Sequence, residues 1–138
     1  MSKSDPNGCV FLMEKPEDIM RKFKRAVTDS DTENCVRYDP TNKPGVANLM
    51  TIYSAVTGKS FDEIEREFAG QGYGVFKPAV GDAVIETLRP IREEATRLLN
   101  DKAYLCSVYT EGAQKASVIA RKTLRKVYKK VGLVEKPF

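Results

Sequence analysis

Apolar residues recur three or four positions apart along most of this chain, which is the spacing of one face of an α-helix. In residues 16–27 the apolar positions follow a proline and two acids that favour a helix start. The same period returns in residues 46–56, 60–70, 75–99 and 102–131. Gly58 is expected to end the helix of residues 46–56, and Ser60 with Glu63 forms a capping-box signature for the next one. The apolar positions, which include Phe23, Val80, Val84 and Tyr104, are expected to be buried. Because no segment alternates apolar and polar residues over a convincing length, the pattern predicts an all-α fold, a helical bundle of about five or six helices.

Two stretches break this periodicity. The run CVFLM (residues 9–13) is too short to distinguish a strand from a buried connection, and we expect a short extended segment before the first helix. The stretch TDSDTENCVRYDPTNKPG (residues 28–45) is dense in turn-forming residues. A loop of this length in a compact domain indicates either a functional role or disorder.

Composition excludes several classes of function. The chain has 138 residues, of which 41% are hydrophobic and 30% charged, as expected for one globular domain. No apolar run or leader predicts a membrane span or secretion, so the cytoplasm is the expected location. Three widely spaced cysteines and no histidine predict neither a disulfide framework nor a metal site. The missing histidine also argues against most hydrolase mechanisms.

Charge is distributed unevenly, although the net charge is only +4. No acidic residue lies between Glu111 and Glu135, where the predicted last helix carries many cations. Such a run suits binding to a phosphate backbone, although a solvated helix face explains it about as well. The candidate phosphate contacts are Lys122, Arg125, Lys126 and Lys129, which Lys22, Arg25, Arg37 and Lys43 could extend.

Two loops carry further candidate chemistry. The acids and amides of residues 28–39 could accept hydrogen bonds from the amino groups of exposed bases, although turns and helix caps account for most such residues. At the start of the chain, Ser2, Lys3 and Ser4 could bind phosphate oxygens. An ordinary chain terminus explains these three residues better when they are considered alone.

Several segments together resemble a known family. In order, these are MSKSDP, KRAVTDSD, RYDP, NKPGVANLMTIYSAVTG, EFAGQGYGVFK and RKTLRKVYKKVG. They are similar to the C-terminal half of bacterial-type tryptophanyl-tRNA synthetases, class I aminoacyl-tRNA synthetases, and the similarity covers nearly the whole chain. MSKS resembles the family's KMSKS signature without its first lysine, so the chain is expected to be a fragment that starts within that motif.

The resemblance implies roles for particular residues. Lys3 would be the catalytic residue of the ATP loop, facing the departing pyrophosphate, and Ser2 and Ser4 would assist it. The loop around Asp31 and Thr32 would read anticodon bases, and Lys122, Arg125, Lys126 and Lys129 would contact tRNA phosphates. ATP with Mg would serve the intact enzyme. We expect neither to bind this chain stably, and we expect no metal site in it.

The resemblance also implies a domain organisation and partners. Residues 1–15 would be the remnant of the KMSKS loop and its connection, and residues 16–138 the helical anticodon-binding domain. The partners would be tRNA for tryptophan and the catalytic Rossmann domain of the same enzyme, which is a homodimer when intact, whereas this chain alone could be a monomer. Alone, it should catalyse no tryptophan-dependent exchange of pyrophosphate into ATP. The alternative is a free-standing helical module that binds RNA or protein through its basic last helix.

Overall fold

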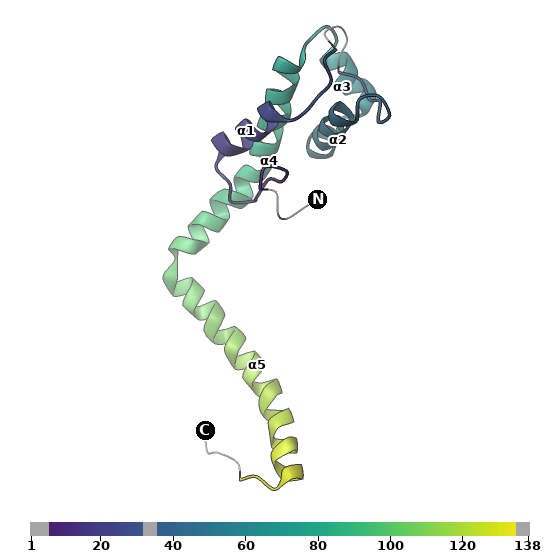
Figure 1. Cartoon of the computed structure of the whole chain (residues 1–138). Coiled ribbons are helices and arrows are strands. Elements are labelled where there is room, and N and C mark those ends of the chain that lie inside the picture. Colours follow the sequence, from purple (N-terminus) through teal and green to yellow (C-terminus); the bar gives the residue numbers. More distant parts are fainter. Residues whose placement is uncertain (1–5, 32–35, 135–138) are drawn as a thin grey trace. The chain divides into compact units, whose positions relative to one another are not determined.

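The computed structural model describes residues 6–31 and 36–134. In this part of the chain there are five α-helices and no strand, which confirms the all-α fold class (Figure 1). The helices are α1 (Pro16–Arg25), α2 (Pro44–Thr57), α3 (Phe61–Glu67), α4 (Tyr73–Asn100) and α5 (Lys102–Val131).

The chain divides into two units, residues 1–93 and 94–138. The first unit contains one hydrophobic core, which α1, α2, α3 and the N-terminal half of α4 build together. Its fully buried large side chains are Ile19, Val46, Met50, Ile64, Phe76 and Val80. In the second unit, α5 has no buried side chain. The predicted bundle is therefore built in the first unit by four helices around a shared core.

Local signals in the sequence explain where the helices begin and end. Pro16 and Pro44 each occupy the first turn of a helix, where a missing N–H costs nothing. Ser60 and Glu63 form a capping box at α3, in which each side chain accepts a hydrogen bond from the other residue's backbone N–H. Gly58 and Gly132 end α2 and α5 with φ of 76° and 73°, a conformation that glycine adopts most easily.

Two local expectations are wrong. The first helix ends at Arg25, and Val27 lies beyond it with 86% of its surface exposed. Leu99 and Tyr104 continue the apolar pattern but are 61% and 47% exposed, because the core of the first unit ends near Val84. The run in residues 9–13, for which the sequence left a strand and a buried connection open, is a connection without strand structure, and its Phe11, Leu12 and Met13 are exposed.

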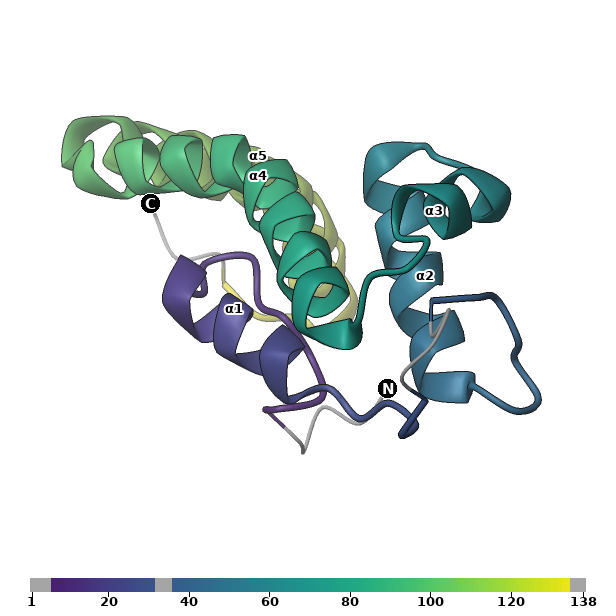
Figure 2. The same cartoon turned by 90° about the horizontal axis from the view of Figure 1, so that it is seen from above.

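Helices approach other parts of the chain closely at two glycines, which have no side chain. In Figures 1 and 2, α1 lies beside the N-terminal part of α4, and α2 lies beside α3. At Gly81 of α4, an added Cβ would lie 3.1 Å from the sulfur of Met20, a flexible side chain of α1. At Gly45 of α2, an added Cβ would lie only 2.3 Å from the carbonyl oxygen of Val27. The start of α2 therefore touches the backbone of the loop that follows α1.

The Gly45→Ala variant should lower the free energy of unfolding by roughly 1–3 kcal/mol, because the new methyl group forces backbone apart in a packed region. Gly74→Ala is a matched control, since Gly74 is also the second residue of its helix but has open space around its Cβ position. Urea denaturation of both variants measures the difference. A Gly45→Ala chain as stable as Gly74→Ala would contradict the close approach.

Candidate nucleic-acid interface

The buried side chain of Lys43 links the loop after α1 to the N-terminal ends of α2 and α4. The side chain of Lys43, which directly precedes α2, is only 3% exposed. Its Nζ lies 3.2 Å from Asp29 Oδ1 and 2.5 Å from Asp31 Oδ2, and it donates to the Tyr73 hydroxyl at 3.3 Å. Tyr73, the first residue of α4, in turn donates its hydroxyl hydrogen to Asp29 Oδ1 at 2.7 Å. We call Asp29, Asp31, Lys43 and Tyr73 the lysine cluster.

The lysine cluster stabilises its charged groups. Burial alone would raise the pKa of Asp29, but hydrogen bonds from Tyr73, from the Asp31 backbone N–H and from Lys43 lower this pKa to about 2. Burial raises the pKa of Tyr73 to about 12, and its hydrogen bond to the Asp29 carboxylate acts in the same direction. Burial of Lys43 opposes its charge, yet its bonds to Asp31, Tyr73 and Asp29 raise its pKa overall. The Asp29 carboxylate and the Lys43 ammonium therefore stay charged at neutral pH.

Stability should depend on pH through Asp29. Its pKa is lower in the folded chain than its ordinary value of 3.8, so its contribution is present above about pH 4 and is lost as the pH falls toward 2. Urea midpoints measured between pH 7 and pH 2.5 should fall more steeply for the unchanged chain than for Asp29→Asn. Tyr73→Phe, which removes one hydrogen bond to this carboxylate, should give an intermediate slope. Parallel curves for all three chains would contradict this role.

Of the two loop residues predicted to read anticodon bases, Asp31 is described by the structure and Thr32 is not. Asp31 is positioned by Lys43, while its side chain remains 53% exposed. Lys43 thus holds one oxygen of this carboxylate, while much of the side-chain surface stays accessible to a ligand. Thr32 lies outside the described residues. At the other end of the loop, Asp39 accepts hydrogen bonds from the backbone N–H groups of Thr41 and Asn42, which closes the turn before α2.

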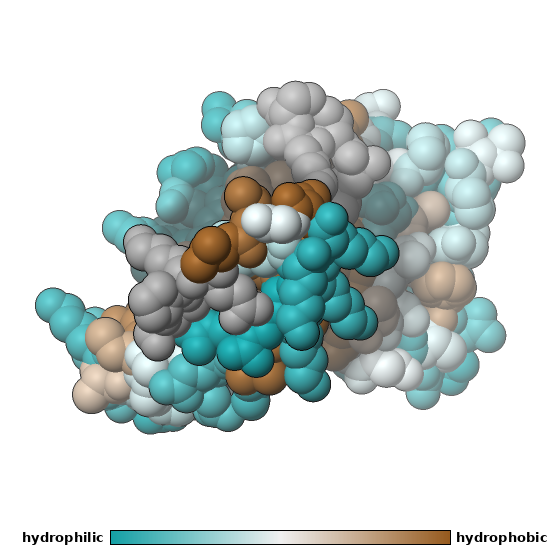
Figure 3. Space-filling model, turned by 90° about the horizontal axis from the view of Figure 1, so that it is seen from below, coloured by the Kyte–Doolittle hydropathy of each residue, from teal (hydrophilic) through white to brown (hydrophobic). Residues whose placement is uncertain are grey.

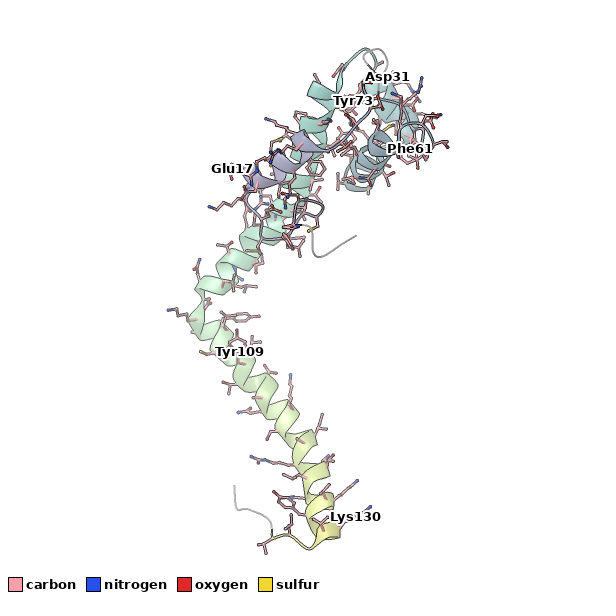
Figure 4. The ribbon with its side chains drawn as sticks, in the orientation of Figure 1. Glu17, Asp31, Phe61, Tyr73, Tyr109 and Lys130 are labelled. Carbon is pink, nitrogen blue, oxygen red and sulfur yellow. The ribbon has the colours of Figure 1, made fainter. Side chains whose placement is uncertain are left out.

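The four predicted phosphate contacts lie on the second half of α5. Lys122, Arg125, Lys126 and Lys129 are all exposed and follow the helical spacing i, i+3, i+4 and i+7, so they share one face. Exposed apolar residues of α5 such as Val127 and Val131 follow a separate stripe. Figure 4 labels Lys130 near the C-terminal end of this helix and Tyr109 in its first half. Figure 3 shows hydrophilic and hydrophobic side chains next to each other on the face that it presents.

Two lysines that could have extended this patch are engaged elsewhere. Lys43 belongs to the buried lysine cluster. The Lys22 ammonium is paired with Glu14 at 2.6 Å, donates to the Cys9 carbonyl at 2.8 Å and lies 5.4 Å from the centre of the Phe11 ring. Since its side chain is only 13% exposed, Lys22 serves to hold residues 9–14 against α1.

The candidate ATP-loop residues Ser2, Lys3 and Ser4 lie outside the described residues. Among the residues that are described, no group of histidine, cysteine, aspartate or glutamate side chains could hold a metal ion. No helix of the described part is both long and apolar enough to cross a bilayer.

Sequence reasoning missed the two central members of the lysine cluster. Lys43 was considered only as a phosphate contact, and no role was predicted for Tyr73. The Tyr73 hydroxyl bonds a carboxylate 44 positions away, a separation that no local pattern reveals. The one available signal was the density of aspartates in the loop. If any of these aspartates is buried, its carboxylate requires a nearby cation.

Comparison with known proteins gives consistent results. A family model described as tRNA synthetases class I (W and Y) matches residues 1–89. The chain is 49% identical over 136 residues to the tryptophan–tRNA ligase of Clostridium tetani (strain Massachusetts / E88), covering 97% of this chain and 39% of that protein. It therefore spans about two fifths of the length of this relative.

Solved structures show the same similarity. The tryptophanyl-tRNA synthetase of Campylobacter jejuni, solved with ADP and tryptophan, is 28% identical and superposes with a TM-score of 0.77 over 96% of this chain and 41% of that one. The enzyme of Mycoplasma pneumoniae is 26% identical, with a TM-score of 0.63 over 98% of this chain and 42% of that one.

Proposed function

This chain belongs to the W and Y family of class I tRNA synthetases, and on that premise we propose that it is the tRNA-binding helical part of an enzyme that ligates tryptophan to its tRNA with ATP. The observation that carries the proposal is the 49% identity to a tryptophan–tRNA ligase along almost the whole chain. Within the family, this favours tryptophan over tyrosine as the amino acid.

The proposed contacts with tRNA fall on two surfaces. In the loop after α1, Asp31 and Thr32 would contact the unpaired bases of the anticodon, and Thr32 lies outside the described residues. A carboxylate accepts hydrogen bonds from exocyclic amino groups, so Asp31 would select bases that carry one. The cations Lys122, Arg125, Lys126 and Lys129 would contact phosphates, which supplies affinity without selecting a sequence.

The start of the chain has a separate proposed role. Lys3 would place a positive charge on the phosphates of ATP, with Ser2 and Ser4 donating hydrogen bonds, as adenylyl transfer needs charge stabilisation at the leaving pyrophosphate. Magnesium would accompany ATP through the phosphate oxygens. Lys22 and Glu14 would hold the connection between this loop and α1 in place.

The remaining partners are also part of the proposal. The catalytic Rossmann domain would bind tryptophan and ATP, and the intact enzyme would be a homodimer in the cytoplasm. A free-standing module with a basic helix would bind RNA through charge alone. The two functions differ in specificity, because a phosphate-binding helix does not distinguish one loop sequence from another.

Competition binding separates these two functions. Labelled tRNA with the tryptophan anticodon is bound to the 138-residue chain at about 0.15 M salt, where non-specific contacts are weakened. Unlabelled tRNA with the same anticodon is then compared with tRNA whose anticodon loop is scrambled. The proposal predicts that the correct tRNA competes better by at least tenfold, a margin of about 1.4 kcal/mol and within the usual cost of one mismatched position. Equal competition by both would reject anticodon reading.

A further inference from the structure

An aromatic pair on the surface of the first unit has no role in the contacts described so far. The rings of Tyr38 and Phe61 are stacked, with centroids 3.9 Å apart and planes inclined by 9°. The other ring contacts of the described residues are edge-to-face and join Tyr53, Phe68 and Phe76, which are buried in the core. Parallel stacking at the surface thus sets Tyr38 and Phe61 apart from the core aromatics.

The order of the two rings leaves one of them facing outward. Phe61, the first residue of α3, is partly buried and packs against the core. Tyr38 lies on Phe61 and is 39% exposed. Phe61 covers one face of the tyrosine ring, so a ligand that stacks on Tyr38 would use the opposite face. A phenol ring is flat and aromatic, as a nucleobase is.

The position of Tyr38 is fixed by its neighbours. Its backbone N–H donates to Glu65 Oε1 of α3 at 2.7 Å. Two residues earlier, Val36 is buried in the core with 5% exposure, and the next residue, Asp39, closes the turn before α2. A ring held in this way loses little conformational entropy when a ligand stacks on it.

The surroundings suit an unpaired base. Tyr38 belongs to the same loop between α1 and α2 as Asp31, and it joins this loop to α3 through Phe61, which Figure 4 labels. Arg37 precedes Tyr38 and is exposed, so a cation is available near the ring for a phosphate. Unpaired RNA bases bind proteins by stacking on aromatic side chains while polar groups read their edges.

We propose that Tyr38, supported by Phe61, is a stacking site for one unpaired nucleobase of the anticodon loop. This inference rests on the proposed function. It adds an aromatic contact to the polar contact proposed for Asp31 and the phosphate contacts proposed for the basic face of α5. Stacking on Tyr38 contributes affinity with little base preference, and nearby carboxylates supply the selection.

Substitutions at Tyr38 test the site by fluorescence anisotropy with a labelled anticodon stem-loop. Tyr38→Leu should weaken binding roughly 5- to 100-fold, the usual loss on removing one stacked base contact, whereas Tyr38→Phe should stay within about twofold of the unchanged chain. Tyr109→Leu is the control, because Tyr109 is a 68% exposed tyrosine of α5 outside the proposed site. Far-UV circular dichroism and urea denaturation verify that each variant is folded.

A second variant reports on stacking without weakening it. The chain contains no tryptophan, so Tyr38→Trp introduces a single fluorophore at the site. A base stacked on this indole should quench its emission when the stem-loop binds, and a blunt duplex of the same stem should not. Replacing loop nucleotides one at a time by abasic sites should abolish quenching at a single position.

The outcomes distinguish this inference from the proposed function. If the unchanged chain prefers the correct loop but Tyr38→Leu binds equally well, or Tyr38→Trp shows no quenching, the stacking site is rejected and anticodon reading stands. If the unchanged chain binds no stem-loop, both are rejected. Loss of binding by Tyr38→Leu together with quenching at one loop position would establish the site.

Discussion

Replacing Lys43 with methionine is expected to lower the free energy of unfolding by about 3 kcal/mol, the largest loss we expect from any single charged residue of this chain. Methionine keeps most of the buried length of the side chain but removes the ammonium. The Asp29 carboxylate would then lie beside Tyr73 without its cation, and Asp31 would lose the contact that positions it. An uncompensated charge in a partly buried site is far more costly than a lost surface pair.

Lys59→Met is the matched control for this variant. Lys59 also pairs with a carboxylate, Glu67 at 2.7 Å, and also lies over a tyrosine ring, at 5.6 Å from the centre of Tyr53. Its side chain, however, is 40% exposed, whereas that of Lys43 is 3% exposed. Urea denaturation should therefore show a large shift for Lys43→Met and a small one for Lys59→Met. Similar shifts would mean that burial of Lys43 is not what gives the cluster its strength.

Removing the basic face of α5 should produce the largest change in RNA binding. The variant carries glutamine at four positions, and its tRNA affinity should fall on the order of 100-fold or more at about 0.1 M salt. Each phosphate contact contributes roughly 0.7 to 0.9 to the slope of log affinity against log salt, so the slope should become less steep by about 3. The four residues are Lys122, Arg125, Lys126 and Lys129.

The control for this variant has the same net charge. It carries glutamine in place of four cations outside α5 that each pair with a nearby carboxylate, namely Arg21, Lys59, Arg89 and Arg97. Because these charges are already partly neutralised, we expect a change of less than about threefold in tRNA affinity. Equal losses in the two variants would show that overall charge, rather than the α5 face, controls binding.

The sequence predicted best those features that depend on neighbouring residues. The capping box of Ser60 and Glu63 and the glycine stop at Gly58 both lie within one helical turn of the boundary they define, and the structure has them as expected. The core positions Phe23, Val80 and Val84 also followed from helical spacing, because each lies on the face of a helix that meets the shared core.

Features that depend on distant residues could not be predicted in this way. The bond from Tyr73 to Asp29 requires the start of α4 to lie beside the loop after α1, and the Tyr38–Phe61 stack requires α3 to lie beside residue 38. Helical spacing also predicted burial for Tyr104, although α5 has no buried residue. Periodicity identifies an apolar face but does not identify what covers it.

A titration of the ¹⁵N-labelled 138-residue chain with the anticodon stem-loop tests the central claim most directly. If this domain reads the anticodon, amide signals of the loop after α1, including residues 29–31 and 36–43, should shift together with those of α5. A stem-loop with a scrambled loop should shift only the α5 signals. Identical shifts with both RNAs, or shifts confined to α5 with the correct one, would contradict anticodon reading and leave a basic helix that binds RNA without selection.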